Sequence, residues 1–462
     1  MYTTRFRLCL IICCLVLFAA LSQQAVAATI CVNPSGSHGC YSTIQAAVNH
    51  ASSHDVINVE PGTYNEDVLV GKPLSLIGAG SDPSVIDATG LAHGIFVDGL
   101  DNPGLNDVTI SGFTVKNAQF EGILVLSAAD VTIENNRIID NDQSSGLSFT
   151  GQPTGCPGQP GDGVYENDET GDCGGALHLI GATNSIVSDN TITGNADGVL
   201  ISDEAAASHD NLLIHNNVSN NPLECGIVLA SHPPMGAIGS AHHGVYHNTV
   251  AENVSTNNGV KIGGSGVGLF SDGIGQGRTS QNVIVRNKLM GNGLGGVALH
   301  THVGPNFGLP ADDMDGNVII ENFIAGNLAD TFDTATPGRV GININSGEGG
   351  SPVQGTIISG NVILDEDIDV AVNVPNELDV HLNDLLGGKI GAGNICVYDY
   401  KLNKDTNMLP AACAHSTVDA TENYWGCATG PGGNGCTTTY GADVRFTPWL
   451  QQSPGNHKGA GN

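Results

Sequence analysis

Histidines and carboxylates gather between residues 178 and 302, a stretch that holds nine of the chain's 16 histidines. Four short apolar runs in it each open on a glycine. The fourth and sixth residues after that glycine are Ser202/Glu204, Ala230/His232, Phe270/Asp272 and His300/His302. Because alternate residues of a strand point to the same side, these positions form one column if the runs are neighbouring strands. His178 joins the column if Gly174 opens the preceding run, and points inward if Gly175 does.

Such a column suits the cleavage of glycans. Elimination needs a base and a group that neutralises the substrate carboxylate; His300 or His302 would be the base, and Arg278 is the basic residue nearest Asp272. Hydrolysis instead needs two acids across a cleft, and the scarcity of basic residues argues against a metal-free lyase. The candidate catalytic residues are Asp272, Arg278, His300, His302 and Glu204.

The same stretch also suits metal binding. The His300-Thr-His302 spacing places two rings on one face of a strand, and histidines of a neighbouring coil would complete a zinc or copper site. The run Asp313-Met-Asp315-Gly316-Asn317 resembles the start of a calcium loop but lacks the later glutamate. The candidate metal ligands are His232, His242, His243, Asp312, Asp313 and Asp315. A third interpretation, that these residues are only solvated loop side chains, stays open.

An internal repeat indicates what positions these residues. The phrase Asn, any residue, an aliphatic, two residues, Asn occurs at 136–141, 190–195, 216–221, 248–253, 287–292 and 322–327, and a seventh copy at 361–366 keeps only its first Asn. The first asparagines lie 54, 26, 32, 39, 35 and 39 residues apart. The shortest interval is near one coil of a parallel β-helix, and the longer ones are that coil plus insertions.

The residue types within the phrase explain the stacking. Asn tolerates the left-handed backbone that a sharp corner needs, and equivalent amides on neighbouring coils can bond as a ladder. The aliphatic residue points inward onto its equivalents. No coil buries its apolar face alone.

These repeats resemble the right-handed parallel β-helix proteins of the pectin lyase-like superfamily, in the group that includes NosD-like periplasmic proteins. The resemblance implies an all-β, single-stranded right-handed parallel β-helix (solenoid) with an N-terminal capping helix. It leaves the reaction open, because the superfamily hosts lyases, hydrolases, epimerases, esterases and binders. The motifs of polygalacturonases and the Asp-Pro-His motif of alginate epimerases are absent from the sequence.

The chain divides into a leader, a long solenoid and a tail. Residues 1–27 have the basic start, apolar centre and small-residue cleavage site of a signal peptide. The β-helix is expected over 28–450, with a capping helix at 42–52 begun by the capping-box pair Ser42 and Gln45. A disulfide-rich closure is expected at 396–450, and 451–462 is expected to be a disordered tail. No other apolar run suggests a transmembrane segment.

Cysteine pairing and charge agree with export. Close spacing predicts local disulfides in an oxidising compartment, and Cys225 is left over as a buried free thiol. The predicted disulfides join Cys31 to Cys40, Cys156 to Cys173, Cys396 to Cys413, and Cys427 to Cys436. After removal of the leader, 13 Lys and Arg face 46 acidic residues, a formal charge of −33, which argues against nucleic acid as a partner.

The sequence therefore predicts a secreted or periplasmic monomer that acts on or binds an extracellular or cell-wall polysaccharide, as a lyase, epimerase or glycoside hydrolase. The alternative is a non-catalytic β-helix that binds metal or serves as a cell-surface structural or adhesion protein. A divalent metal, calcium or zinc/copper, is the cofactor that either interpretation allows.

Overall fold

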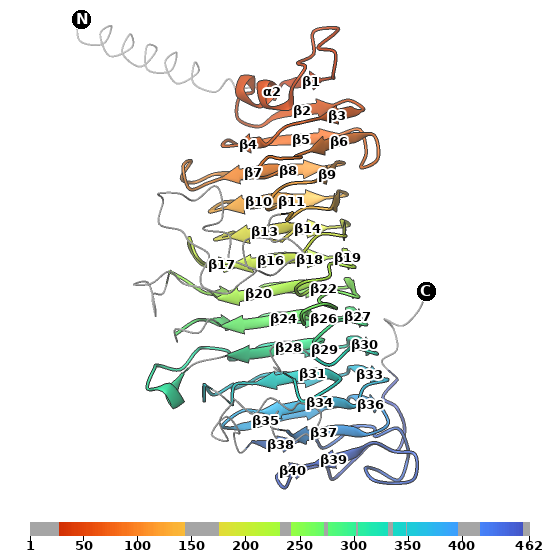
Figure 1. Cartoon of the computed structure of the whole chain (residues 1–462). Coiled ribbons are helices and arrows are strands. Elements are labelled where there is room, and N and C mark those ends of the chain that lie inside the picture. Colours follow the sequence, from red (N-terminus) through yellow and green to blue (C-terminus); the bar gives the residue numbers. More distant parts are fainter. Residues whose placement is uncertain are drawn as a thin grey trace, which may run out of the picture.

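The chain forms a tall stack of coils in which each turn contributes short strands to long parallel sheets (Figure 1). This computed structural model describes residues 27–143, 175–231, 242–271, 276–301, 304–330, 336–347, 349–395 and 416–455. The architecture is a right-handed parallel β-helix, as predicted. Among the described residues, no helix has the length and apolar character that crossing a membrane requires.

Three long sheets and one short sheet make up the stack. The 14-stranded sheet contains, in order, β1 (Thr29–Val32), β2 (Asp55–Val59), β5 (Leu74–Gly78), β8 (Asn106–Ser111), β11 (Ala129–Glu134), β14 (Ile186–Ser188), β18 (Leu212–Ile214), β22 (Thr249–Ala251), β26 (Val283–Val285), β29 (Val318–Ile320), β32 (Ile357–Ser359), β35 (Glu377–His381), β38 (Thr417–Asp419) and β40 (Val444–Arg445). The 12-stranded sheet contains β39 (Thr438–Tyr440), β37 (Ile390–Asn394), β34 (Ile368–Asn373), β31 (Val340–Asn345), β28 (Gly295–Thr301), β24 (Ser265–Ser271), β20 (Ile227–Ser231), β16 (Val199–Ser202), β13 (Leu177–Ile180), β10 (Ile123–Leu126), β7 (Ile95–Asp98) and β4 (Val68–Val70). The 11-stranded sheet contains β3 (Gly62–Tyr64), β6 (Ser84–Asp87), β9 (Thr114–Lys116), β12 (Arg137–Ile139), β15 (Thr191–Thr193), β19 (Asn217–Ser219), β23 (Val254–Thr256), β27 (Lys288–Met290), β30 (Phe323–Ala325), β33 (Val362–Leu364) and β36 (Asp384–Leu386), and the three-stranded sheet contains β17 (Ser208–His209), β21 (Val245–Tyr246) and β25 (Thr279–Ser280).

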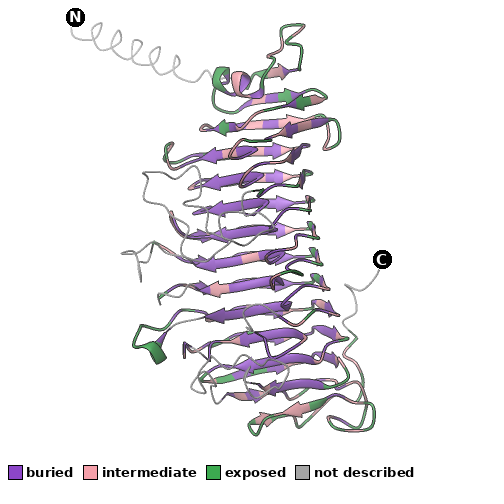
Figure 2. Cartoon of the chain, viewed as in Figure 1, coloured by how far each residue is buried: buried purple, intermediate pink, exposed green. Residues whose placement is uncertain are grey.

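The core is a set of aliphatic columns that run up the inside of the stack. Alternate residues of each strand point inward, and the strand register lays them on their equivalents in the next coil. One column contains Ile123, Leu177, Val199, Ile227, Val267, Val297, Ile342 and Val370. All eight are at most 2% exposed, and Figure 2 shows the strands buried along most of the stack. Each such side chain contributes roughly 1.5–3 kcal/mol when buried.

Asparagine ladders line the corners, as predicted. The first ladder joins nine residues, in which the backbone N–H and side-chain amide of each Asn donate to Oδ1 of the next at 2.8–3.2 Å. Its members are Asn136, Asn190, Asn216, Asn253, Asn287, Asn322, Asn361, Asn383 and Asn423. A second ladder joins Asn141, Asn195, Asn221, Asn258, Asn292 and Asn327, and a third joins Asn211, Asn248, Asn282 and Asn317.

Two details of the predicted repeat are wrong. Asn248 belongs to the third ladder and Asn253 to the first, so the 248–253 copy spans a different pair of corners from the other copies. The left-handed residue at each corner is the one before the ladder Asn, such as His215 (φ 59°) or Arg286 (φ 53°). The Asn therefore serves as a buried amide that bonds to the next coil, and its tolerance of left-handed backbone is not used.

The N-terminal end is closed by α2 (Ile44–His50), which packs on β1, β2 and β4. Its N-cap is Thr43 rather than Ser42, with the Thr43 hydroxyl accepting from Ala46 N–H at 3.2 Å. The Glu66 carboxylate accepts from the backbone N–H groups of residues 44 and 45. The Gln45 amide bonds to both backbone groups of Leu69 in the edge strand β4.

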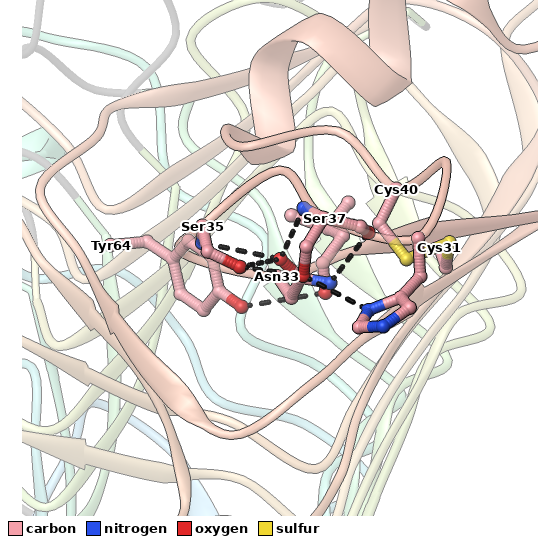
Figure 3. Close-up of a disulfide and its surroundings, with 8 residues drawn as sticks. Cys31, Asn33, Ser35, Ser37, Cys40 and Tyr64 are labelled. Carbon is pink, nitrogen blue, oxygen red and sulfur yellow. Dashed lines mark hydrogen bonds between the residues drawn. A yellow bond between two sulfur atoms is a disulfide. The ribbon is translucent and has the colours of Figure 1, made fainter.

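One disulfide lies near each end of the described chain, and two of the four predicted pairs are confirmed. Cys31–Cys40 closes the loop after β1, where the Asn33 side chain bonds to the backbone N–H and hydroxyl of Ser35 and to the backbone N–H and carbonyl of Ser37 (Figure 3). Cys427–Cys436 forms near the C-terminal end, where the Trp425 side chain is completely buried.

The other cysteine predictions have different outcomes. Cys225 is a free, buried thiol, as expected. The predicted disulfide between Cys156 and Cys173 lies outside the described residues, and so does the one between Cys396 and Cys413. These two pairings therefore stay predictions. The predicted leader also lies outside the described residues, up to residue 26.

Candidate active site on the twelve-stranded sheet

A row of buried polar side chains runs across four neighbouring coils of the 12-stranded sheet, those of β7, β10, β13 and β16. Glu121 lies between two imidazoles: its Oε2 is 2.8 Å from His93 Nδ1, and its Oε1 is 3.5 Å from His178 Nδ1. His178 Nε2 lies 2.7 Å from the Ser202 hydroxyl, which donates to Glu204 Oε2. All five side chains are at most 3% exposed. We call this set, His93, Glu121, His178, Ser202 and Glu204, the His–Glu chain.

The β-helix register assembles these groups from residues far apart in sequence. His93 and Glu121 stand at equivalent places on successive coils, two residues before the paired Ile95 and Ile123. His178 is on the next coil, in β13, and Ser202 is on the one after, in β16. Four stacked coils therefore bring together side chains that span more than 100 residues of sequence.

The hydrogen-bond directions fix where the protons lie. The Ser202 proton is given to Glu204, so His178 Nε2 must donate to the Ser202 oxygen. The His178 Nδ1 that faces Glu121 is also favoured in its protonated form, because a lone pair there would meet a carboxylate. Burial is the largest influence on Glu121 and opposes its ionisation, but the charges and hydrogen bonds of His93 and His178 lower its pKa to about 2. The His–Glu chain thus contains an ionised glutamate between two imidazoles.

The predicted column exists at its fourth-residue positions. Ala230, Phe270 and His300 pair in register on successive strands, and their side chains share the outward face of the 12-stranded sheet. The His300 ring is 7% exposed and packs on Phe270, with ring centroids 4.2 Å apart. Asn345 and Asn373 continue the column, and the Asn373 amide donates to Asn345 Oδ1 at 3.0 Å.

Other parts of the predicted column are placed differently. His178 lies two residues after Ala176, the register equivalent of Gly198, so neither Gly174 nor Gly175 is the lead residue. His178 nevertheless faces outward, in register with Leu124 and Leu200. Glu204 is described and belongs to the His–Glu chain, whereas His232, Asp272 and His302 lie outside the described residues.

Arg278 lies on a different sheet from His300. It precedes β25 of the three-stranded sheet, and its guanidinium carbon is 3.9 Å from the centre of the Tyr246 ring. Its Nε is 3.3 Å from Asp313 Oδ2, so a proposed metal ligand is the partner of a proposed catalytic residue.

The remaining predicted metal ligands make separate contacts. Asp312 Oδ1 accepts from Gly277 N–H at 3.0 Å, and Asp315 Oδ1 accepts from Gln354 N–H at 2.7 Å. His243 Nδ1 donates to the carbonyl of Asp203 at 2.7 Å, which joins its loop to the segment after β16 that contains Glu204. His242 is exposed. Over the part of the chain that the structure describes, the set of carboxylates and imidazoles close enough to share one ion is Asp379, His381 and Asp419.

Sequence reasoning missed His93, Glu121 and the role of Ser202. The usable signal was positional: His93 and Glu121 each precede the glycine that opens a strand, at Gly94 and Gly122. Comparing the residue before the opening glycine on every coil would have identified His93 and Glu121 as equivalent positions from the sequence alone.

Comparisons with known proteins address the fold. A family model described as "Right handed beta helix region" matches residues 93–266. No curated protein matches the chain in sequence. Among solved structures, the catalytic unit of a GH87 α-1,3-glucanase from Streptomyces thermodiastaticus superposes with a TM-score of 0.53 at 16% identity, over 95% of this chain and 72% of that one.

Two further structures are similar over much of their length. The A-module of the mannuronan C-5 epimerase AlgE4 from Azotobacter vinelandii has a TM-score of 0.46 at 14% identity, over 89% of this chain and 93% of that one. An alginate lyase from Paenibacillus has a TM-score of 0.41 at 13% identity, over 72% and 97%. With identities this low, the likeness concerns the fold, and this chain has a right-handed parallel β-helix fold.

Proposed function

We propose that this protein is an exported enzyme that hydrolyses a neutral polysaccharide at the His–Glu chain. The observation that carries the proposal is the position of Glu204, which accepts from Ser202, while Ser202 bonds to an imidazole, His178, that faces Glu121. A carboxyl group supplied with protons in this way is suited to general acid and base work on a glycosidic bond.

Each member of the relay has its own role in the proposal. Glu204 is the group that would exchange a proton with the glycosidic oxygen or with water. His178 and Ser202 are positioning residues, because they act on Glu204 through hydrogen bonds. Glu121 faces both imidazoles of the network, His93 and His178. A purely structural network needs no ionised groups, and buried charges contribute little net stability, whereas perturbed titratable groups often mark functional sites.

Charge favours a neutral substrate over a uronate polymer. The whole chain has a formal charge of −31, which repels polyanions unless cations intervene. Arg278, the candidate for binding a uronate carboxylate, is already paired with Asp313. Lyases and epimerases act on uronates and need such a positive group, so hydrolysis fits the described side chains better.

Support for export comes from two local disulfides, which persist in oxidising compartments, and from the leader-like first 27 residues. The fold likeness to a GH87 α-1,3-glucanase is compatible with the same proposal. N-terminal sequencing of protein recovered from the culture medium or periplasm tests export directly.

The activity is tested with purified protein on a panel of neutral glycans and uronate glycans, with assays for new reducing ends and for unsaturated products. Glu204→Gln is expected to lower kcat by about a hundredfold or more, because it removes the carboxyl group that exchanges the proton, and His178→Asn should shift the pH profile. Glu252→Gln, an exposed site bound by Arg286, is the matched control.

Native activity in Glu204→Gln would contradict the assignment of the acid, and unsaturated products from uronates would contradict the reaction class. If the native protein leaves every glycan intact but binds one, as measured by affinity electrophoresis, the non-catalytic binding function replaces the enzymatic one.

A further inference from the structure

A second cluster of chemistry-bearing side chains lies on the 14-stranded sheet near the C-terminal end of the stack (Figure 1). Asp379 and His381 are two residues apart in β35, so both point outward from a strand whose Leu378 and Val380 are in the core. Asp419 of β38 pairs in register with Asp379. One ligand atom from each of the three residues lies within 4.8 Å of the others.

The imidazole is held in the orientation that metal ligation requires. His381 Nδ1 lies 2.9 Å from the carbonyl oxygen of Thr421, and a carbonyl can only accept, so Nδ1 carries the proton. In the neutral ring the lone pair is then on Nε2, the atom that faces the Asp379 carboxylate at 3.8 Å. Ligating histidines commonly donate their other N–H to a backbone carbonyl in this way, which fixes both tautomer and ring direction.

The carboxylates at this site outnumber the cationic side chains that pair with them, which favours the binding of a cation. Glu377, Asp379 and Asp419 bring three carboxylates to adjacent strands, and like charges directly opposite each other destabilise a sheet. Arg445 pairs with Glu377 and with Asp419 Oδ2, and Thr421 binds Asp419 Oδ1. Asp379 has no such cationic partner beyond His381 among these contacts, and its side chain is 62% exposed.

We propose that Asp379, His381 and Asp419 bind one divalent transition-metal ion, zinc or manganese, at the outer surface of the 14-stranded sheet. Two carboxylate oxygens and one imidazole nitrogen suit these ions, whereas calcium prefers oxygen ligands alone. Three protein ligands leave positions open to water or to an outside group. The site is on a different sheet from the His–Glu chain, so this proposal stands or falls independently of the proposed hydrolase.

The test uses untagged, chelator-treated full-length mature protein, titrated with Zn²⁺, Mn²⁺ and Ca²⁺ in separate calorimetry experiments. We expect saturable Zn²⁺ binding and a zinc-dependent rise in Tm, because an ion that binds only the folded state stabilises it. Asp379→Asn and His381→Ala should each abolish one equivalent of bound zinc. His381→Gln, which can still donate to the Thr421 carbonyl, should lose it as well.

His215→Asn is the matched control. His215 also lies between two acids, 3.0 Å from Glu252 and 3.9 Å from Asp189, but Arg286 already pairs with Glu252, so zinc binding should be unchanged. Absence of saturable zinc binding by the native protein would overturn the proposal. Unchanged zinc stoichiometry in both Asp379→Asn and His381→Gln would also overturn it, since any ion bound would then be elsewhere.

Discussion

Glu366 occupies the place in the second ladder where six preceding coils each have an Asn. Its Oε1 accepts from the backbone N–H and the side-chain amide of Asn327, both at 2.9 Å, as an amide oxygen would. Asp369, also buried, lies nearby and accepts from Gly387 N–H at 3.1 Å. Burial raises the pKa of Glu366 to about 7 and raises that of Asp369 well above its usual range. The ladder thus ends at Glu366, in a carboxyl group that fits best when neutral.

Glu366→Gln should remove a pH dependence from the stability of the fold. A raised folded-state pKa means that the stabilisation is fully present below the unfolded pKa of 4.5 and is lost as the pH rises through about 7. We expect the variant to match the native protein at low pH and to exceed its stability above pH 7, by at most about 3 kcal/mol. Denaturant unfolding across this range measures the difference.

The control is Glu60→Gln, a substitution at an exposed glutamate. The stability of this variant should parallel that of the native protein at every pH. A constant difference between Glu366→Gln and the native protein from low to high pH would show that folding leaves the pKa of this carboxyl unchanged, and would contradict the argument.

The site residues were predictable only in part, for a reason that lies in the chain's geometry. Glu204 and His300 were found because they follow a glycine-led strand at fixed offsets, which is local information. Glu121 and His178 are 57 residues apart in sequence, and the position of His178 depended on which residue led its strand. The residue that leads this strand is Ala176, which is in register with glycines on other coils. Counting offsets from a glycine therefore could not place His178.

Corner ladders are the element that fixes the register of the stack. Asn287 shows the full pattern: its Oδ1 accepts two N–H groups of Asn253, and its amide donates to the Val250 carbonyl and to Asn322 Oδ1, at 2.8–3.1 Å. The side chain is 1% exposed. Since water cannot replace these partners, each corner amide specifies how one coil sits on the next.

Asn287→Ala should therefore destabilise the middle of the stack. Removing the amide leaves buried groups of Asn253 and Val250 without partners, at a cost of about 1–3 kcal/mol for each unsatisfied group. Asn65→Ala, at an exposed position with one weak bond of 3.4 Å, should change stability by no more than about 0.5 kcal/mol. Chemical unfolding of both variants gives the comparison. Equal stability of the two would mean that the ladder amides contribute nothing beyond solvent hydrogen bonds.

The sequence predicted the ladders but not their corners. Asn-x-aliphatic-x-x-Asn describes two successive corners equally well, since 211–216, 282–287 and 317–322 fit it as closely as 216–221 or 287–292. The copy at 248–253 was therefore assigned to the wrong pair of corners. The segment that spans the same two corners as the other copies is 253–258. Its inward position, which is aliphatic in the other copies, is Ser255, whose hydroxyl donates to the Gly266 carbonyl at 2.7 Å. Because of this serine, 253–258 does not match the repeat pattern.

At the scale of the whole molecule, an open stack must protect the strands at its ends. Edge strands with unpaired backbone groups invite association with other chains. At the N-terminal end, α2 covers the first coils, with Ile44, Ala47 and Val48 buried against them. Gln45 bonds to both backbone groups of Leu69 in the edge strand β4, and Lys72 Nζ donates to the Ala51 carbonyl at the end of the helix at 2.9 Å. The helix therefore occupies hydrogen-bonding groups that a second chain would otherwise pair with.

Val48→Asp should uncover this end of the stack and cause self-association. Val48 is 2% exposed, and an unpaired carboxylate buried there costs several kcal/mol, so the helix should detach and expose the β4 edge. Asn49→Asp adds the same carboxylate one residue later on the exposed side of α2 and is the matched control. Light scattering during gel filtration should show larger assemblies for Val48→Asp alone. If Val48→Asp stays at the size of the native protein while its circular dichroism shows intact strands, then α2 is not what keeps the N-terminal edge from pairing.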